Sequence, residues 1–418
     1  MSFGVTAAIA FLVFASNAAV SPLYRIYQAR FGFSTTTLTL LFAVYVAVLL
    51  LTLLLLGSIS DYAGRRPVML AGLTMGAAAC ALFLSAHGLG LLFAARSSQG
   101  VAAGLLSGTA SAALHDFRPD GRATPVVSSA SPTGGQALGA VGASALAQYA
   151  FAPTHLIWWL ILAAFVLGIV AVVLMPEPGP VGAGAMGSLR PNVGVPHAAR
   201  GAFVAALPAL VGTWALAGAY LSLGPSLAAQ LLHSENLLWG GILIFLLTGL
   251  GAAASSVLAK RDPSTAMLGG CLALIAGALV TLASVQTGTP AALFIGTAVA
   301  GLGLGPAFMG AYRSTTALAP PEDRAGVIAA IYIVSYLATG IPAVIGGIAA
   351  SHYGLHSTAL VYLAVVAGLA MVAVGLLIRR RMAPGTATRG MDHPEAPPGL
   401  GTVPPCPPVK PRPAHAKA

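Results

Sequence analysis

Residues 35–67 read TTTLTLLFAVYVAVLLLTLLLLGSISDYAGRRP, and this stretch decides the fold of the chain. From Thr35 to Leu56 it contains no charged residue, and a helix of that length rises about 33 Å, which is enough to cross the hydrocarbon core of a bilayer. A short polar segment follows, and Pro67 then opens a second apolar run. Proline is tolerated in the first turn of a helix, so the stretch predicts two membrane-spanning helices joined by a tight turn.

The composition of the whole chain is that of a membrane protein. Of its 418 residues, 57% are hydrophobic and 7% are charged, and the mean hydropathy is +0.88. A soluble enzyme carries about 25% charged residues, so that class is excluded. In lipid the backbone must satisfy its own hydrogen bonds, and apolar runs of this length therefore predict helices. Twelve such runs lie at 3–22, 36–57, 67–87, 89–113, 124–149, 154–175, 201–224, 237–258, 265–286, 290–312, 325–350 and 357–378.

The two halves of the chain repeat each other. Residues 119–123 read PDGRA after the fourth run, and residues 321–325 read PEDRA after the tenth. The expected fold is an all-α membrane protein with twelve transmembrane helices in two six-helix, pseudo-symmetric bundles, a layout in which the substrate site lies between the halves. The expected domains are a first bundle at 1–175, a cytoplasmic linker at 176–200, a second bundle at 201–381 and a disordered, proline-rich cytoplasmic tail at 382–418.

The placement of Lys and Arg predicts the orientation in the membrane. If the N-terminus is cytoplasmic, the cytoplasmic loops and the tail hold 17 of the 20 basic residues, and the outer loops hold only Arg25 and Arg30. Arg96 lies within a span. Because basic residues collect on the cytoplasmic side of multi-pass proteins, we expect both termini in the cytoplasm. Three Lys against 17 Arg, with abundant Ala and Gly, points to a GC-rich bacterial genome, and we expect the protein in the bacterial cytoplasmic (inner) membrane.

The segment between the second and third runs follows the pattern G-x-x-x-D-x-x-G-R-R over residues 57–66. Two arginines alone would be explained as topology anchors, but the full spacing resembles the signature loop of the major facilitator superfamily. The resemblance covers about residues 3–378 and implies that this loop latches the two halves in one conformational state. The conformational-switch residues it implies are Gly57, Asp61, Gly64, Arg65 and Arg66.

The fourth run carries a buried charge in a second motif. Residues 96–104 read RSSQGVAAG and are similar to the R-x-x-Q-G motif of the same family. Arg96 lies about 10 Å inside the run, where an arginine usually faces the protein interior or a water-filled cavity. The alternative is a side chain that reaches back to the outer interface. Gln99 shares its helix face, and Gly100 and Gly104 are expected to permit close helix packing.

The fifth run contains SPTGGQALGAVG at residues 131–142. It resembles the glycine-rich motif of family members with antiport activity, although the proline expected after Gly139 is replaced by Ala140. Its glycines Gly135, Gly139 and Gly142 are expected to pack against a neighbouring helix.

A central cavity between the halves would be amphipathic and carry one positive charge. Such a cavity suits an organic anion, a sugar-like molecule or a mixed apolar-polar compound better than a strongly cationic drug. For each aromatic residue the competing interpretation is packing against lipid or core. The expected substrate or coupling residues are Asn17, Arg96, Gln99, Gln136, Trp214, Tyr220, Tyr332 and Tyr336, with Tyr45 beside them.

The runs hold no clearly embedded Asp, Glu or Lys, which proton coupling usually needs. No P-loop, metal cluster or nucleophile pattern is found, so we expect no cofactor, no metal, no nucleic acid and no enzyme activity. The first hypothesis is a monomeric secondary transporter that performs proton-coupled efflux of a small organic molecule. The second is uptake or uniport of a sugar-like or anionic metabolite, and the third, of another class, is a transport-inactive scaffold or sensor.

Overall fold

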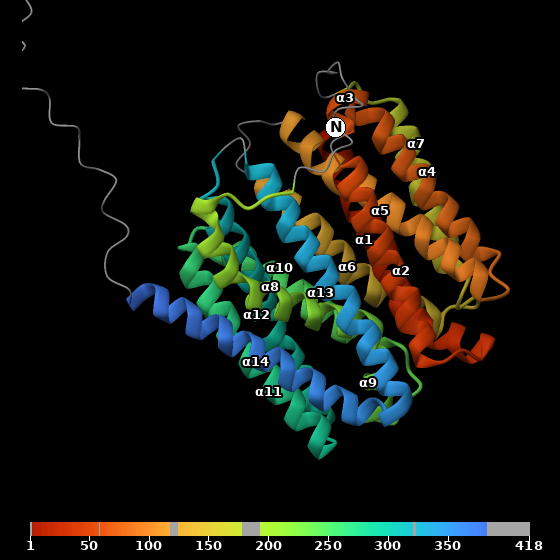
Figure 1. The fold of residues 1–418 in the computed structure, drawn as a ribbon. Helices are drawn as coiled ribbons and strands as arrows, with labels where there is room; N and C mark the ends of the chain where they lie inside the picture. The colour runs from red at the N-terminus through yellow and green to blue at the C-terminus, as the bar shows by residue number, and fades with distance from the viewer. Residues whose placement is uncertain (1, 58, 118–123, 178–192, 321–322, 383–418) are drawn as a thin grey trace, which may run out of the picture. The chain divides into compact units, whose positions relative to one another are not determined.

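A computed structural model describes residues 2–57, 59–117, 124–177, 193–320 and 323–382. Within these residues the chain forms fourteen α-helices and no β-strand (Figure 1). The helices are α1 (Ser2–Phe31), α2 (Thr35–Leu56), α3 (Ser60–Ala63), α4 (Arg65–Leu84), α5 (Leu89–Phe117), α6 (Thr124–Tyr149), α7 (Leu156–Val173), α8 (His197–Ser222), α9 (Gly224–Leu232), α10 (Leu238–Leu258), α11 (Pro263–Thr287), α12 (Pro290–Thr316), α13 (Arg324–Tyr353) and α14 (Leu355–Met382).

Twelve of these helices are long and correspond one to one with the twelve predicted runs. Eleven of the twelve are long and apolar enough to cross a membrane. The remaining long helix, α6, begins with the polar sequence TPVVSSASPTGG. Small and polar residues of this kind are common where membrane helices pack against one another, and α6 packs against both α1 and α10.

The ends of the predicted runs agree with the structure to within four residues, except at α1. That helix continues nine residues past the predicted end, so Arg25 and Arg30 lie on a helix and not in a loop. Asp116, three residues past the predicted end of the fourth run, lies in the last turn of α5. Counting apolar residues stops where a helix leaves the lipid, whereas the helix itself continues as long as its backbone hydrogen bonds do. The short helices α3 and α9 were not predicted.

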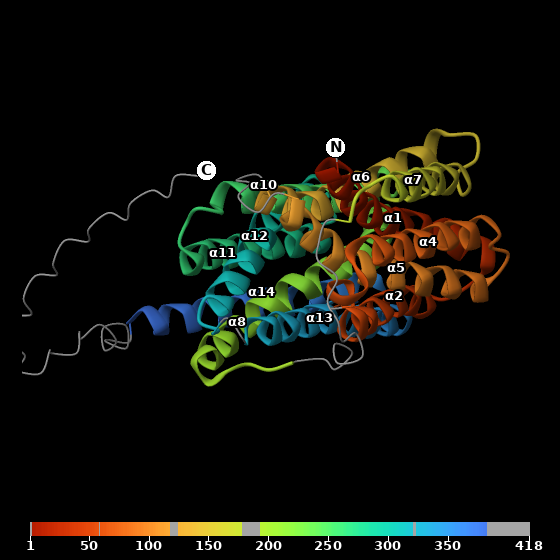
Figure 2. The ribbon, with the colours of Figure 1, turned by 90° about the horizontal axis from the view of Figure 1, so that it is seen from above.

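The helices pack in the same pattern in both halves of the chain. In the first half α5 contacts α1, α2 and α4, and α1 also contacts α6. In the second half α12 contacts α8, α10 and α11, and α8 also contacts α13. Figure 2 shows the first half, α1 to α7, beside the second half, α8 to α14. The predicted fold class, two six-helix pseudo-symmetric bundles in an all-α membrane protein, is confirmed.

Two helix pairs join the halves, and we call them the seams. One seam is formed by α2 and α13 and the other by α6 and α10. Because α2 corresponds to α10 and α6 to α13, the internal repeat exchanges one seam for the other. Residues 1–378 form one compact unit that contains both seams, and residues 379–418 form a separate unit. The predicted boundaries of the bundles, linker and tail stay predictions.

Helix starts follow from capping side chains. Ser34 Oγ accepts the backbone N–H of Thr37 at 3.2 Å and begins α2. Asp262 Oδ2 accepts the N–H of Thr265 at 2.8 Å, and Pro263 occupies the first turn of α11. Both caps satisfy N–H groups that have no partner within their helix. Asp262 thus acts as a helix cap.

Candidate functional site

The signature loop is folded around the guanidinium of Arg65. Asp61 lies in the single-turn helix α3, and α4 begins four residues later at Arg65. The Arg65 side chain donates to Asp61, to Ser60 Oγ at 2.7 Å and to Asp116 Oδ2 at 3.0 Å. Only 15% of the Arg65 side chain is exposed. The loop therefore ties α3 and α4 to the last turn of α5, at what we call the signature end of the bundle.

A carboxylate from beyond α7 covers the start of α4. Glu177 Oε1 accepts the backbone N–H of Arg65 at 2.6 Å, and both Glu177 oxygens lie within 3.3 Å of the N–H of Arg66. The first N–H groups of a helix lack partners and carry positive partial charge, so a carboxylate there is stabilising. Gly64, with φ +92°, precedes them, and a Cβ at this position would lie 3.1 Å from Glu177 Oε2. Glycine therefore serves both the backbone angle and the approach of the carboxylate.

The two remaining switch residues lie at helix ends. Arg66 Nε donates to Val172 O at 3.0 Å, and its guanidinium also donates to Val173 O, the last residue of α7. The cation thus meets carbonyls that have no partner within the helix. Gly57 follows α2 and donates its N–H to Leu53 O at 2.9 Å. All five predicted switch residues lie at the signature end, and their role in switching stays a prediction.

Sequence reasoning did not include Asp116 or Glu177 among the switch residues. The chain has only ten acidic residues, and unpaired arginines at a helix start need acidic partners. Asp116 follows the end of the fourth run, which leads back to the signature end, by three residues, and Glu177 follows the end of the sixth run by two residues. That scarcity of carboxylates was the signal that could have identified both.

We expect Glu177→Gln to lower the thermal stability of the purified protein by a small amount. A carboxylate at a helix start contributes about 0.3–1 kcal/mol, and the amide keeps the shape but removes the charge. Melting temperatures of the two proteins in detergent, measured at low and high salt, check this. The difference should shrink at high salt because ions screen the charge. Equal melting temperatures at low salt would contradict it.

Arg96 is a buried cation inside the first half. Its residue is 1% exposed, its Nη1 donates to Gln99 Oε1 at 2.7 Å, and its Nε lies 3.4 Å from Leu41 O. The guanidinium lies over the ring of Tyr45, 4.2 Å from the ring centroid, and 5.9 Å from that of Tyr24. Among the described residues no carboxylate pairs with it. The side chain points inward and does not reach the interface.

The surroundings of Arg96 offset the cost of burying its charge. A charged side chain at the centre of a membrane helix costs about 2.5–3.5 kcal/mol or more. A buried cation over an aromatic ring recovers about 2 kcal/mol, and a hydrogen bond to a charged group about 1.5–3 kcal/mol. These terms are of similar size, so the arginine stays charged without an acidic partner. The site therefore keeps an uncompensated positive charge.

Polar groups of α1 extend this site. Gln99 Nε2 donates to the backbone oxygen of Ser16 at 3.1 Å and to its Oγ at 3.2 Å. Asn17 Nδ2 donates to the hydroxyl of Tyr45 at 3.0 Å. Three of the predicted residues, Asn17, Arg96 and Gln99, are thus joined into one network with Tyr45 between α1, α2 and α5.

Aromatic residues of the second half lie toward this network. Tyr336 on α13 packs against the hydrophobic core of the first half. Its ring centroid lies 6.1 Å from that of Trp214 on α8 and 6.1 Å from that of Tyr332. Trp214 also meets Phe308 edge-on at 5.2 Å. The predicted aromatics Trp214, Tyr332 and Tyr336 therefore form one cluster, and Tyr336 connects it to the first half.

Several buried polar atoms in these two groups have no hydrogen-bond partner within the described part of the protein. Such atoms are uncommon in folded proteins, because desolvation without a partner is costly. They give the region unused hydrogen-bonding capacity next to aromatic rings and one cation. The atoms are Asn17 Oδ1, the Tyr24 hydroxyl, Trp214 Nε1 and Ser335 Oγ.

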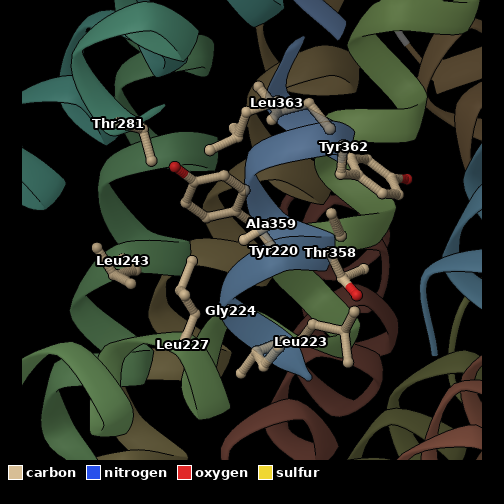
Figure 3. Close-up of a pocket in the computed structure, with 13 residues that line it drawn as sticks. Tyr220, Leu223, Gly224, Leu227, Leu243, Thr281, Thr358, Ala359, Tyr362 and Leu363 are labelled. Atoms are coloured by element: carbon tan, nitrogen blue, oxygen red, sulfur yellow. The ribbon is translucent and has the colours of Figure 1, made fainter. Parts of the chain in front are cut away.

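Tyr220 lies elsewhere. The hydroxyl of Tyr220 is 2.9 Å from Thr297 Oγ1. The Tyr220 ring lines an apolar cavity of about 40 Å³ between α8, α9, α10, α11 and α14, with its oxygen directed toward Thr281 (Figure 3). Gln136 is half-buried on α6. The structure thus separates Tyr220 from the Arg96 network, although both were expected to line one cavity.

Four of the five predicted packing glycines lie at close helix contacts. A Cβ on Gly100 or Gly104 would meet α2, at 2.9 Å from Val48 Cβ and 2.6 Å from Thr52 Cβ respectively. Gly135 and Gly139 lie against the backbone of Phe11 and Ala15 on α1. Gly142 departs from the expectation, because a Cβ there would have no neighbour within 4 Å.

Hydrogen bonds cross between the halves at the end opposite the signature loop. The N–H of Leu237 donates to Gln148 Oε1 at 2.9 Å, and Asn236 Nδ2 donates to the Tyr149 hydroxyl at 3.2 Å. On the other seam the N–H of Thr36 donates to Ser351 Oγ at 3.2 Å. These contacts hold the two halves together at this end. All the groups in them come from residues near the starts of α2 and α10 or the ends of α6 and α13.

Each seam also has a glycine facing a hydroxyl side chain at this end. A Cβ on Gly241 of α10 would lie 2.8 Å from Ser144 Cβ of α6. A Cβ on Gly347 of α13 would lie 2.7 Å from Thr39 Cβ of α2. Since α10 corresponds to α2 and α13 to α6, the glycine lies on opposite partners of the two seams, on α10 in one and on α13 in the other. The halves can approach this closely only because both positions lack a side chain.

An open hollow of about 570 Å³ lies at this end, and we call it the vestibule. An ion pair crosses between the halves beside it, since Arg25 Nη2 lies 2.6 Å from Glu235 Oε2. The residues that line the vestibule are Arg25, Ile26, Ala29, Arg30, Gln148, Glu235 and Leu237. We refer to this end of the bundle as the vestibule end.

Solved structures of transporters have the same fold. The nucleoside transporter NupG superimposes with a TM-score of 0.70 at 13% identity, over 90% of this chain and 100% of that one. The peptide transporter POT in complex with alafosfalin gives 0.71 at 17% identity, over 91% and 93%. A bacterial homolog of the human lysosomal transporter Spinster, inward-facing and occupied, gives 0.71 at 15% identity, over 92% and 98%. No curated protein sequence matches this chain.

Evidence from the sequence agrees with the fold. The family model described as Major Facilitator Superfamily matches residues 6–289, which include the signature loop, Arg96 and the glycines of α6. The match covers the first half and the second half as far as the end of α11. The chain therefore belongs to the Major Facilitator Superfamily of membrane transporters.

Proposed function

We propose that the protein is a secondary transporter that carries a small organic molecule with a negatively charged group across the cytoplasmic membrane by alternating access. The observation that carries this proposal is Arg96, a fully buried cation without a carboxylate partner among the described residues. A substrate anion would supply the missing charge. The unpartnered atoms of Asn17 and Trp214, together with the ring of Tyr336, would bind its polar and apolar parts.

Alternating access is supported by the two seams. The cross-seam hydrogen bonds and the Gly241 and Gly347 contacts hold the halves together at the vestibule end. In a rocking motion each half moves as one body, so the contacts along a seam form and break together. Small residues let the helices of a seam pack closely when the seam is closed. In this proposal the vestibule end faces the outside, both termini are cytoplasmic, and the Asp61–Arg65–Asp116 group stabilises one of the two states.

For direction and coupling the proposal is proton-driven efflux, because the glycine-rich α6 resembles the antiporter motif. The alternative within transport is uptake or uniport of an anionic metabolite. This alternative is favoured by the absence of an acidic residue beside Arg96, which is the one charged residue buried in the described core. Proton coupling usually needs such a titratable group within the membrane. The protein is proposed to act as a monomer.

The experiment is flux in proteoliposomes. A thermal-shift screen of organic acids, sugars and neutral compounds identifies a ligand, and its uptake into or release from liposomes is then measured with and without a proton gradient. Proton-coupled efflux predicts that a proton gradient drives the ligand against its own concentration gradient. Equal rates with and without the proton gradient indicate uniport. Absence of flux for every ligand that stabilises the protein would contradict transport.

We expect Asp61→Asn to reduce this flux at least tenfold while leaving membrane insertion normal. The amide removes the charge that pairs with Arg65, so the signature loop would no longer hold its state. Initial rates at equal protein amounts check this, with Arg200→Gln as control because Arg200 is exposed and its Nε donates to Val195 O of its own segment at 3.1 Å. An unchanged rate would count against a switching role and favour a scaffold.

A further inference from the structure

The charged residues at the vestibule end are gathered in one place. Among the described residues, the Asp, Glu, Lys and Arg side chains on the surface of this end are Arg25, Arg30 and Glu235, and all three line the vestibule. Two come from α1 in the first half and one from the segment before α10 in the second half. The vestibule therefore has a net positive charge and lies across the boundary between the halves.

The two side chains of the vestibule ion pair differ in their exposure to solvent. The Arg25 side chain is 19% exposed, whereas the Glu235 side chain is 94% exposed. Glu235 is already hydrated and loses little when it leaves Arg25. Arg25 is largely desolvated, so an anion that replaces Glu235 meets a cation that water competes for only weakly.

Both arginines of α1 line the vestibule, and they project from different sides of the helix. Arg25 and Arg30 are five residues apart on α1, which is about 7.5 Å along the helix axis. The open hollow of about 570 Å³ that both line falls within the volume range of small-molecule sites. Gln148, whose side-chain oxygen accepts from the N–H of Leu237, also lines the vestibule and connects α6 to the residue before α10.

We propose that the vestibule is a binding site for a water-soluble anion with one or two carboxylate groups, which Arg25 and Arg30 bind in place of Glu235. Occupation of the site removes the Arg25–Glu235 pair, which is the ion pair linking the halves at this end. The bound anion therefore favours separation of the halves at the vestibule end. The site is distinct from the Arg96 network and does not depend on whether the protein transports the same anion.

The test is a distance measurement on the full chain in phosphatidylcholine nanodiscs. Spin labels are placed at Phe151→Cys in the first half and Tyr353→Cys in the second, since these side chains at the vestibule end are 91% and 76% exposed. Cys80 and Cys271 are buried and stay in place, and Cys406 is replaced by serine. The distance distribution is recorded during titration with succinate, and with succinamide, its uncharged counterpart, at constant ionic strength set by sodium chloride.

We expect succinate, and not succinamide, to increase the population with the longer distance. Glu235→Gln should show part of this population without ligand and should lower the half-saturating succinate concentration about two- to fivefold, the size of effect expected when an exposed ion pair no longer competes. Arg25→Gln should abolish the response, and Arg30→Gln should weaken it. Arg200→Gln, at the other end of the molecule, should respond as the unchanged protein does.

A response that is absent in the unchanged protein, equal for succinamide, or retained in Arg25→Gln would overturn the proposal. Glu235→Gln changes a nearly fully exposed side chain, so it keeps the proposal testable if Arg25→Gln fails to fold. Because the readout is a distance and not flux, loss of the succinate response leaves the transport proposal standing. Loss of flux with an intact response would leave the vestibule site standing.

Discussion

Arg96→Ala is expected to abolish transport. The substitution removes the one buried charge of the described core, together with its position over the Tyr45 ring. A hydrogen bond between a bound anion and a charged group contributes about 1.5–3 kcal/mol, which corresponds to about a 10- to 150-fold loss of affinity when it is lost. The initial flux of the identified ligand measures the loss of transport, and the thermal-shift titration measures the loss of affinity separately.

Controls distinguish loss of the charge from loss of the fold. Alanine leaves Gln99 Oε1 without its 2.7 Å partner and creates a space beside Tyr45, so some loss of stability is expected in any case. Arg96→Lys keeps the charge but lacks the planar group that lies over the ring, and it should retain part of the affinity. Arg200→Ala should have no effect. Normal flux in a folded Arg96→Ala protein would show that this charge lies outside the path.

Gly241→Trp is expected to prevent closure at the vestibule end and to stop the transport cycle. Even a Cβ at this position would lie 2.8 Å from Ser144 Cβ, so an indole fits only if α6 and α10 separate. Overpacking by a few atoms already costs about 1–3 kcal/mol, and about 5.5 kcal/mol moves a two-state equilibrium from 99:1 to 1:99. A tryptophan exceeds what the seam can accommodate, and the population should shift almost completely to the state open at this end.

The spin-label pair at Phe151→Cys and Tyr353→Cys measures this shift directly. The long distance should dominate in Gly241→Trp without any ligand, and flux should fall by at least an order of magnitude. Gly269→Trp is the matched control, because Gly269 is exposed on α11 and a Cβ there has no neighbour within 4 Å. Gly347→Trp on the other seam should reproduce the result if the two contacts are equivalent. An unchanged distance in Gly241→Trp would contradict the seam's role.

Much of the fold could be predicted because helix number and length depend on local sequence. An apolar run of about 20 residues has few alternatives in a bilayer, and helix ends were therefore placed within four residues at all but one position. The error at α1 is informative, since the helix continues through Arg25 and Arg30 to Phe31, past the end of the apolar run. The same counting could not find α3 or α9, which are too short to span a membrane.

The site was predicted in part. The pairing of Arg96 with Gln99 follows from their spacing on one helix, and the structure has it. The sequence could not show that Tyr220 lies apart from the other predicted aromatic residues, because packing between helices determines which residues an aromatic side chain contacts. It lies with Thr297 and Thr281 inside the second half (Figure 3). The roles of all these residues in substrate binding stay predictions.

By itself the sequence determined the all-helical membrane architecture, the repeat of two halves, the family and the presence of one charge in a span. Only the tertiary structure decided which groups far apart in the chain meet: Glu177 on the start of α4, Glu235 on Arg25, and Gly347 on Thr39. The physical reason is that helix formation is a local response to the bilayer. Partners separated by more than one hundred residues are set by shape and charge across the packed helices.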